Sequence, residues 1–129
     1  MTGFSNQTFS IITQFAKIME IDRITPASDG SVTFELEHAG TLCLTASTDG
    51  SRVLVSLSRP PESLQTGVLA RFLGLSHFDF HLGVSFNAGM NAGGGLMLVA
   101  DIATSELSPQ IIDQCLTRLI SLHEGFVAL

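Results

Sequence analysis

Hydrophobic residues recur at the spacing of an α-helix in three parts of the chain. In residues 6–21, 62–73 and 109–122 the apolar positions repeat every three or four residues, which places them on one side of a helix. Gly74 is suited to end the second segment, and Ser108 to cap the third. The apolar stripe covers nearly half of the first and second helices, whereas docking on a core needs only about 100°. The pattern therefore predicts three helices, two of which have surplus apolar surface.

Between these segments, apolar and polar residues alternate with the period of a β-strand. Residues 31–38, 41–48 and 52–58 each show this alternation, and turn sequences at 38–40 and 49–50 separate them. Two further strands, 86–90 and 96–102, flank a glycine-rich turn. The predicted order is αβββαββα, an α+β fold with a twisted antiparallel sheet and three helices. At 129 residues, we expect one domain spanning residues 1–129.

The glycine-rich stretch FNAGMNAGGGLMLVAD, residues 86–101, could hold a phosphate or form a hairpin. Its glycines match neither a dinucleotide fingerprint nor a P-loop, and no lysine or arginine lies between Arg71 and Arg118. The residues after the glycines have a strand pattern, whereas a phosphate site needs a helix N-terminus there. We therefore predict a hairpin.

Composition adds to this picture. Charged residues make up 14% of the chain, against about 25% in ordinary soluble domains, so we expect a homodimer. No apolar run approaches the roughly 20 residues of a membrane span, and no secretory signal is visible; we expect a cytoplasmic protein. A net charge of −6 without a basic stripe argues against nucleic-acid binding. Cys43 and Cys115 have no CxxC spacing and are expected to be buried thiols.

The sharpest candidate for chemistry is HFDFH, residues 77–81. On a strand, His77, Asp79 and His81 would share a face and resemble the ligands of an iron or zinc site. Strand alternation explains the same residues if Phe78, Phe80 and Leu82 face the core and the polar residues face water. We favour this second interpretation and expect no metal, no cofactor and no enzymatic activity.

The element order resembles that of the class I chaperones of bacterial type III secretion. The resemblance covers residues 4–21, 32–58, 62–73, 80–102 and 108–122, and it depends on pattern, because the family has no short diagnostic motif. It implies a homodimer without enzymatic activity that works in the bacterial cytoplasm. Such a chaperone binds the N-terminal segment of a secreted effector in extended form and keeps it stable and competent for secretion.

The resemblance also implies roles for residues by their place in each element. The second helix and the following strand would form the dimer interface, with Val68, Leu69, Phe72, Leu73, Phe80 and Leu82. The first helix would contact the effector through Ile11, Phe15 and Ile18, while Phe9, Ile12, Ala16 and Met19 meet the sheet. Two alternatives stay open: a small metal-dependent enzyme using His77, Asp79 and His81, and a small-ligand-binding dimer. The identity of the effector is not encoded in this chain.

Overall fold

The computed structural model describes residues 4–21, 26–27, 30–60 and 67–127 of the chain. In chain order the elements are α1 (Asn6–Ile18), β1 (Val32–Leu36), β2 (Gly40–Ala46), β3 (Arg52–Arg59), α2 (Val68–Leu73), β4 (His77–Asp79), β5 (Val84–Met90), β6 (Leu96–Ala103), the 3₁₀ turn η1 (Thr104–Glu106) and α3 (Pro109–Val127). The predicted order is confirmed except for one additional short strand, β4. The predicted second helix is described only from Val68, because residues 62–66 lie outside the described part.

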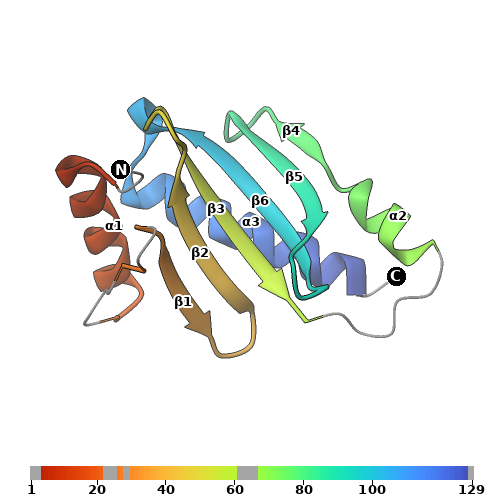
Figure 1. Ribbon diagram of the computed structural model, residues 1–129. Helices are drawn as coiled ribbons and strands as arrows, with labels where there is room; N and C mark the ends of the chain where they lie inside the picture. Colours follow the sequence, from red (N-terminus) through yellow and green to blue (C-terminus); the bar gives the residue numbers. More distant parts are fainter. Residues whose placement is uncertain (1–3, 22–25, 28–29, 61–66, 128–129) are drawn as a thin grey trace.

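All six strands of the described chain form one antiparallel sheet with the order β1-β2-β3-β6-β5-β4 (Figure 1). The chain first builds the meander β1-β2-β3 and then crosses through α2 to β4 at the far edge. From there it returns through β5 to β6, which pairs with β3 from Arg52↔Ala103 to Arg59↔Leu96. β1, β2 and β3 therefore lie on one side of β6, and β4 and β5 lie on the other.

The helices leave one face of the sheet open. The long helix α3 passes behind the strands, α1 lies beside β1, and α2 lies at the opposite end beside β4 and β5 (Figure 1). Alternate residues of the central strands face α3 and are buried: Val53, Val55, Leu57, Leu98, Ala100 and Ile102. They pack with Ile112, Cys115, Leu116 and Leu119 of α3 and with Ile12, Phe15 and Ala16 of α1. Each large side chain buried in this way contributes about 1.5–3 kcal/mol.

Local hydrogen bonds fix where the helices begin. The Ser5 side chain accepts a hydrogen bond from the backbone N–H of Thr8, and the Ser108 hydroxyl accepts one from that of Ile111. Both are N-caps, which satisfy donors that the first turn leaves unpaired. The prediction that Ser108 caps the last helix is thus confirmed. Among the described residues, no helix is both long and apolar enough to cross a membrane.

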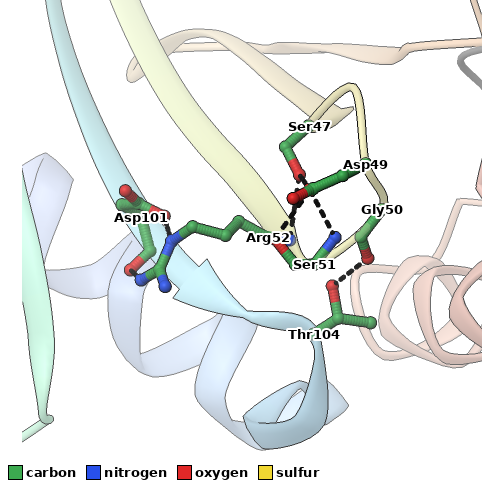
Figure 2. A network of polar contacts seen from close by, with 7 residues as sticks. All are labelled: Ser47, Asp49, Gly50, Ser51, Arg52, Asp101 and Thr104. Carbon is green, nitrogen blue, oxygen red and sulfur yellow. Dashed lines mark hydrogen bonds and ion pairs between the residues drawn. The ribbon is translucent and has the colours of Figure 1, made fainter.

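The tip of the β2–β3 hairpin is tied to the end of β6 (Figure 2). The Asp49 carboxylate accepts hydrogen bonds from the hydroxyls of Ser47 and Ser51 and from the backbone N–H of Ser51. These bonds favour the ionised form and lower the pKa of Asp49 to about 2. Thr104 donates to the carbonyl of Gly50, and a separate ion pair joins Arg52 to Asp101. The hairpin and the start of the last connection therefore hold each other.

The two cysteines differ in their surroundings. Cys115 of α3 is fully buried, as predicted, and burial raises the pKa of its thiol to about 12. Cys43 is only partly buried, because it occupies the alternate position of β2 that faces away from the helices. Its sulfur lies 3.5 Å from the Thr45 hydroxyl. The prediction of a buried thiol is therefore wrong for Cys43.

Candidate functional site

A groove lies at the β1 end of the sheet. It has a volume of about 410 Å³ and lies between the C-terminal end of α1, the end of β1 with the β1–β2 turn, and the second half of α3. Its apolar lining consists of Met19, Ile21, Leu36, Ala39, Leu116 and Ile120. Beside it, the outer edge of β1 pairs with no other strand among the described residues. The groove therefore combines an apolar floor with backbone groups that are free to accept a further strand.

The wall formed by α1 depends on how that helix ends. The backbone N–H of Ile21 donates to the carbonyl of Ala16 at 2.8 Å, and that of Glu20 to Lys17 at 3.0 Å. This pair of bonds is a Schellman motif, which requires a left-handed residue after the cap Met19. Glu20 takes this position with φ of 61°, where glycine is the usual residue. The motif turns the chain back so that Met19 and Ile21 both line the groove.

The rim of the groove is acidic. Its carboxylates are Glu35, Glu37 and Glu124. The Glu35 carboxylate accepts a hydrogen bond of 2.9 Å from the Thr41 hydroxyl, and the Glu37 carboxylate lies 3.8 Å from the imidazole of His38. The side chains of Glu37 and Glu124 are 90% and 66% exposed. Two different elements, the β1–β2 turn and α3, thus carry exposed carboxylates to one groove.

Arg59, at the end of β3, supplies the cation near this rim. Its Nε donates to the carbonyl of Ala39 at 2.7 Å, and its Nη2 lies 3.8 Å from the Glu124 carboxylate. Nη2 is buried and has no hydrogen-bond partner among the described residues. This guanidinium partly offsets the charge of Glu124 and holds the β1–β2 turn in place. It does not compensate all three carboxylates.

The structure separates the three residues of α1 that were expected to contact an effector. Ile18 is 57% exposed and Ile11 is partly buried. Phe15 is fully buried, with its ring edge-to-face against Phe34 at 6.4 Å between ring centres. The expectation that Phe15 lies on an accessible edge is therefore wrong. Either edge of the broad apolar stripe of α1 could face the sheet, and in the structure the edge that carries Phe15 does so.

A second apolar surface lies at the opposite, β4 end of the sheet. Phe80 is 88% exposed, Phe78 49% and Leu73 43%. The rings of Phe78 and Phe80 contact each other edge-to-face, with 4.9 Å between centres. We call Leu73, Phe78 and Phe80 the β4-end apolar patch. Large exposed side chains gathered in this way are typical of interaction surfaces.

The expected dimer-interface residues are only partly exposed in the structure. Phe72 is fully buried within the protomer, where its ring lies 5.6 Å from His123 and 5.1 Å from Phe126. Its expected place at an accessible interface is therefore wrong, because it anchors α2 to α3. Leu69 and Leu82 are partly buried. The side chain of Val68 lies outside the described part of the structure.

The first side chains of the HFDFH motif face the opposite ways from those in the favoured interpretation. His77 faces inward, where its ring stacks on Phe86 at 5.4 Å between centres and its Nδ1 lies 2.6 Å from the carbonyl of Leu75. Phe78 points to the other face. The prediction that Phe78 and Phe80 face the core is therefore wrong, and sequence alternation alone could not tell the two faces apart.

Asp79 ends β4 and shapes the turn that follows. Its carboxylate accepts hydrogen bonds from the backbone N–H groups of Leu82 and His81, and it lies 3.4 Å from the Nε of Arg118 on α3. The bond from Leu82, with those other partners, lowers the pKa of Asp79. Because the strand ends here, His81 leaves the face that it was expected to share with His77. In the described ranges, no group of three metal-ligating side chains is brought together.

Sequence reasoning missed most of the groove. Leu36 follows from strand alternation, and Leu116 and Ile120 are four residues apart on one helix face. These signals indicate apolar surface, but they do not show that the end of α1 and the β1–β2 turn meet α3. Phe78 was assigned to the core, because alternation along the short strand β4 does not show which of its two faces is buried.

Comparisons with known proteins agree with this architecture. Residues 10–126 match the model of the Tir chaperone protein (CesT) family. No curated protein sequence matches the chain.

Three solved structures of protein complexes contain a chain with a similar fold. The Yersinia pestis type III secretion chaperone SycH, in complex with a stable fragment of YscM2, is 16% identical; the match covers 95% of this chain and 98% of that one, with a TM-score of 0.69. The ExsC–ExsE complex gives 15% identity, coverage of 98% and 96%, and a TM-score of 0.79. The HopA1–SchA chaperone–effector complex gives 18% identity, coverage of 95% of this chain and 93% of that one, and a TM-score of 0.63. At these identities the solved structures establish a shared fold.

Proposed function

Because the chain belongs to the Tir chaperone protein (CesT) family, we propose that this chaperone binds the N-terminal segment of a type III secreted effector in extended form. Binding keeps the segment stable and competent for secretion, and it takes place in the bacterial cytoplasm. The proposed activity consists of holding a chain, so it needs neither a cofactor nor a catalytic group.

The observation that supports this proposal most directly is the groove beside the outer edge of β1, which pairs with no other strand in the described part of the chain. An extended segment can add a strand to that edge through backbone hydrogen bonds and place alternate side chains on the apolar floor. The groove volume of about 410 Å³ lies within the range of about 300–1,000 Å³ typical of sites that enclose small ligands. The groove is therefore large enough for apolar side chains of an unfolded segment and too small for a folded domain.

The β4-end apolar patch supports a homodimer. Phe78 belongs to β4, the edge strand farthest from β1 (Figure 1), while Leu73 ends α2 just before that strand and Phe80 directly follows it. A stable interface buries about 800 Å² on each partner, with aromatic side chains at its centre. In the proposed dimer, a second copy of this chain covers the patch, and both grooves stay open at the outer ends.

Binding of effector segments tests the proposed function. The N-terminal segments of the effectors encoded in the same genome are labelled with a fluorophore and titrated with the purified chaperone, and binding is followed by anisotropy. We expect at least one segment to bind at micromolar concentration or tighter. Ile18→Ser, one residue before the groove wall, should weaken binding up to about tenfold, or about 1.4 kcal/mol.

Met90→Ser is the matched control, because Met90 is 42% exposed and lies on β5, four strand positions from β1. This variant should bind as the original protein does. If none of the segments binds the folded protein, the proposed function is wrong. If Ile18→Ser and Met90→Ser bind equally well, the exposed side of α1 beside the groove does not contact the segment.

A further inference from the structure

We propose that the groove selects segments in which a lysine or arginine accompanies the apolar side chains, and that Glu37 and Glu124 are the residues that determine this specificity. The inference depends on the proposed function, since it names the chemistry of the segment bound in that groove. It concerns the rim, whereas the proposed function depends on the floor and the edge of β1.

Glu37 and Glu124 can affect binding because both line the groove in which the segment would lie. Apolar side chains and the edge of β1, which pairs with no other described strand, give a segment its place, and the same groove is lined by Glu35, Glu37 and Glu124. Glu37 projects from the β1–β2 turn and Glu124 from α3, so a side chain emerging from a bound segment meets carboxylates on two elements. Both carboxylates are exposed and only loosely paired, since Arg59 lies 3.8 Å from Glu124 and the His38 imidazole lies 3.8 Å from Glu37.

A bound segment changes the surroundings of both carboxylates. It displaces water from one side of each, which strengthens their interaction with any nearby charge. A lysine or arginine then gains attraction, whereas an aspartate or glutamate is repelled. Exposed ion pairs of this kind change affinity by about two- to fivefold each, and they weaken as salt is added. Two carboxylates acting together therefore give a measurable preference without making the segment bind by charge alone.

The preference can be measured without knowing the client. The probe is a displayed library of random peptides about twelve residues long, which covers a typical strand of about five or six residues and its flanks. The library is selected on the original protein and on the double variant Glu37→Gln/Glu124→Gln. We expect peptides selected on the original protein to be enriched in alternating apolar residues and in lysine or arginine. The double variant should keep the apolar enrichment and lose most of the basic enrichment.

A charge-matched control separates the rim from the overall charge of the protein. Glu106→Gln/Asp113→Asn removes two exposed carboxylates that do not line the groove, so the net charge changes by the same amount. This variant should select basic peptides as the original protein does. The selected peptides should also bind the original protein several-fold more weakly at about 0.5 M salt than at 0.05 M, and this difference should shrink in the groove variant.

The outcomes separate the two proposals. Basic enrichment that is absent from the original protein, or equal in the groove variant, would overturn the inference while leaving apolar binding intact. Basic enrichment lost equally in the control variant would also overturn it, because net charge would then be the cause. Selection without any apolar enrichment would mean that the groove does not bind extended segments, so the proposed function itself would fail.

Discussion

His123 is a buried polar residue whose protonation is coupled to folding. It is 2% exposed, and its Nε2 donates to the carbonyl of Leu57 at 2.8 Å, because a carbonyl oxygen only accepts. Burial, together with the charge of nearby Arg59, lowers the pKa of His123 even though the hydrogen bond to Leu57 opposes this. Folding therefore favours the neutral imidazole over the charged one.

The sign of this shift predicts how stability depends on pH. The unfolded chain, with an ordinary histidine pKa of about 6.5, binds the proton more readily than the folded one. The contribution of His123 is therefore complete above that value and is lost as the pH falls below it. Thermal melts should show a lower Tm at pH 5.5 than at pH 7.5, and His123→Gln should reduce the difference. His38→Gln is the control, because the His38 side chain is exposed. If His123→Gln keeps the full pH dependence of Tm, His123 is not its cause.

Glu20 offers a second prediction at the residue scale. A non-glycine residue in the left-handed region costs about 1–2 kcal/mol, whereas glycine adds about 0.4–1 kcal/mol of entropy to the unfolded chain. Glu20→Gly should therefore raise the free energy of unfolding by about 0.5–1 kcal/mol in urea titrations. Glu20→Ala keeps the strained backbone and should give no such gain. A gain in the alanine variant as large as in the glycine variant would show that backbone strain is not the cause.

At the scale of elements, the two sides of α1 should respond differently to truncation. Ile12→Ala removes a fully buried side chain and should cost about 2–5 kcal/mol, whereas Ile18→Ala, at a position 57% exposed, should cost well under 1 kcal/mol. Phe15→Ala should also be strongly destabilising, as Ile12→Ala is, because Phe15 is buried against Phe34. Urea titrations of the three variants measure the contrast. Equal losses at Ile12 and Ile18 would mean that α1 is covered on both sides.

The elements themselves could be predicted from sequence far better than their mutual contacts. The segments with period-two alternation predicted the β1-β2-β3 meander, the glycine-rich turn predicted the last hairpin, and Ser108 predicted the start of α3. β4 is absent from the predicted order because it is only three residues long. Its faces were assigned in reverse, because polar His77 faces inward and Phe78 outward. The groove could not be derived, because Glu37 and Glu124 are brought together only by the packing of α3 against the sheet.

At the scale of the whole molecule, Phe80 is the residue on which the homodimer is best tested. We expect light scattering to give the mass of a dimer for the original protein and of a monomer for Phe80→Glu. An unpaired charge buried in an interface costs several kcal/mol, whereas 88% exposure of Phe80 means that the protomer tolerates the change. Circular dichroism should show that the variant stays folded. Phe72→Glu should instead unfold the protomer, since Phe72 packs against His123 and Phe126.

Two outcomes would revise this view of the assembly. A monomer mass for the original protein at micromolar concentration would remove the proposed dimer. A dimer that persists in Phe80→Glu would place the interface elsewhere, and the open face of the sheet would be the next surface to test.

Because the two cysteines are unequally buried, a thiol-reactive dye can be attached to one of them alone. Only the thiolate reacts quickly with maleimides and aromatic disulfides, and the Cys115 thiol is fully enclosed, with its pKa raised to about 12. Cys43 stands on the sheet face away from the helices. Native protein should therefore consume one equivalent of Ellman's reagent rapidly and a second only after denaturation. A dye at Cys43 then reports on the open face of the sheet without any substitution in the chain, so quenching on dimerisation or client binding would show directly which event covers it.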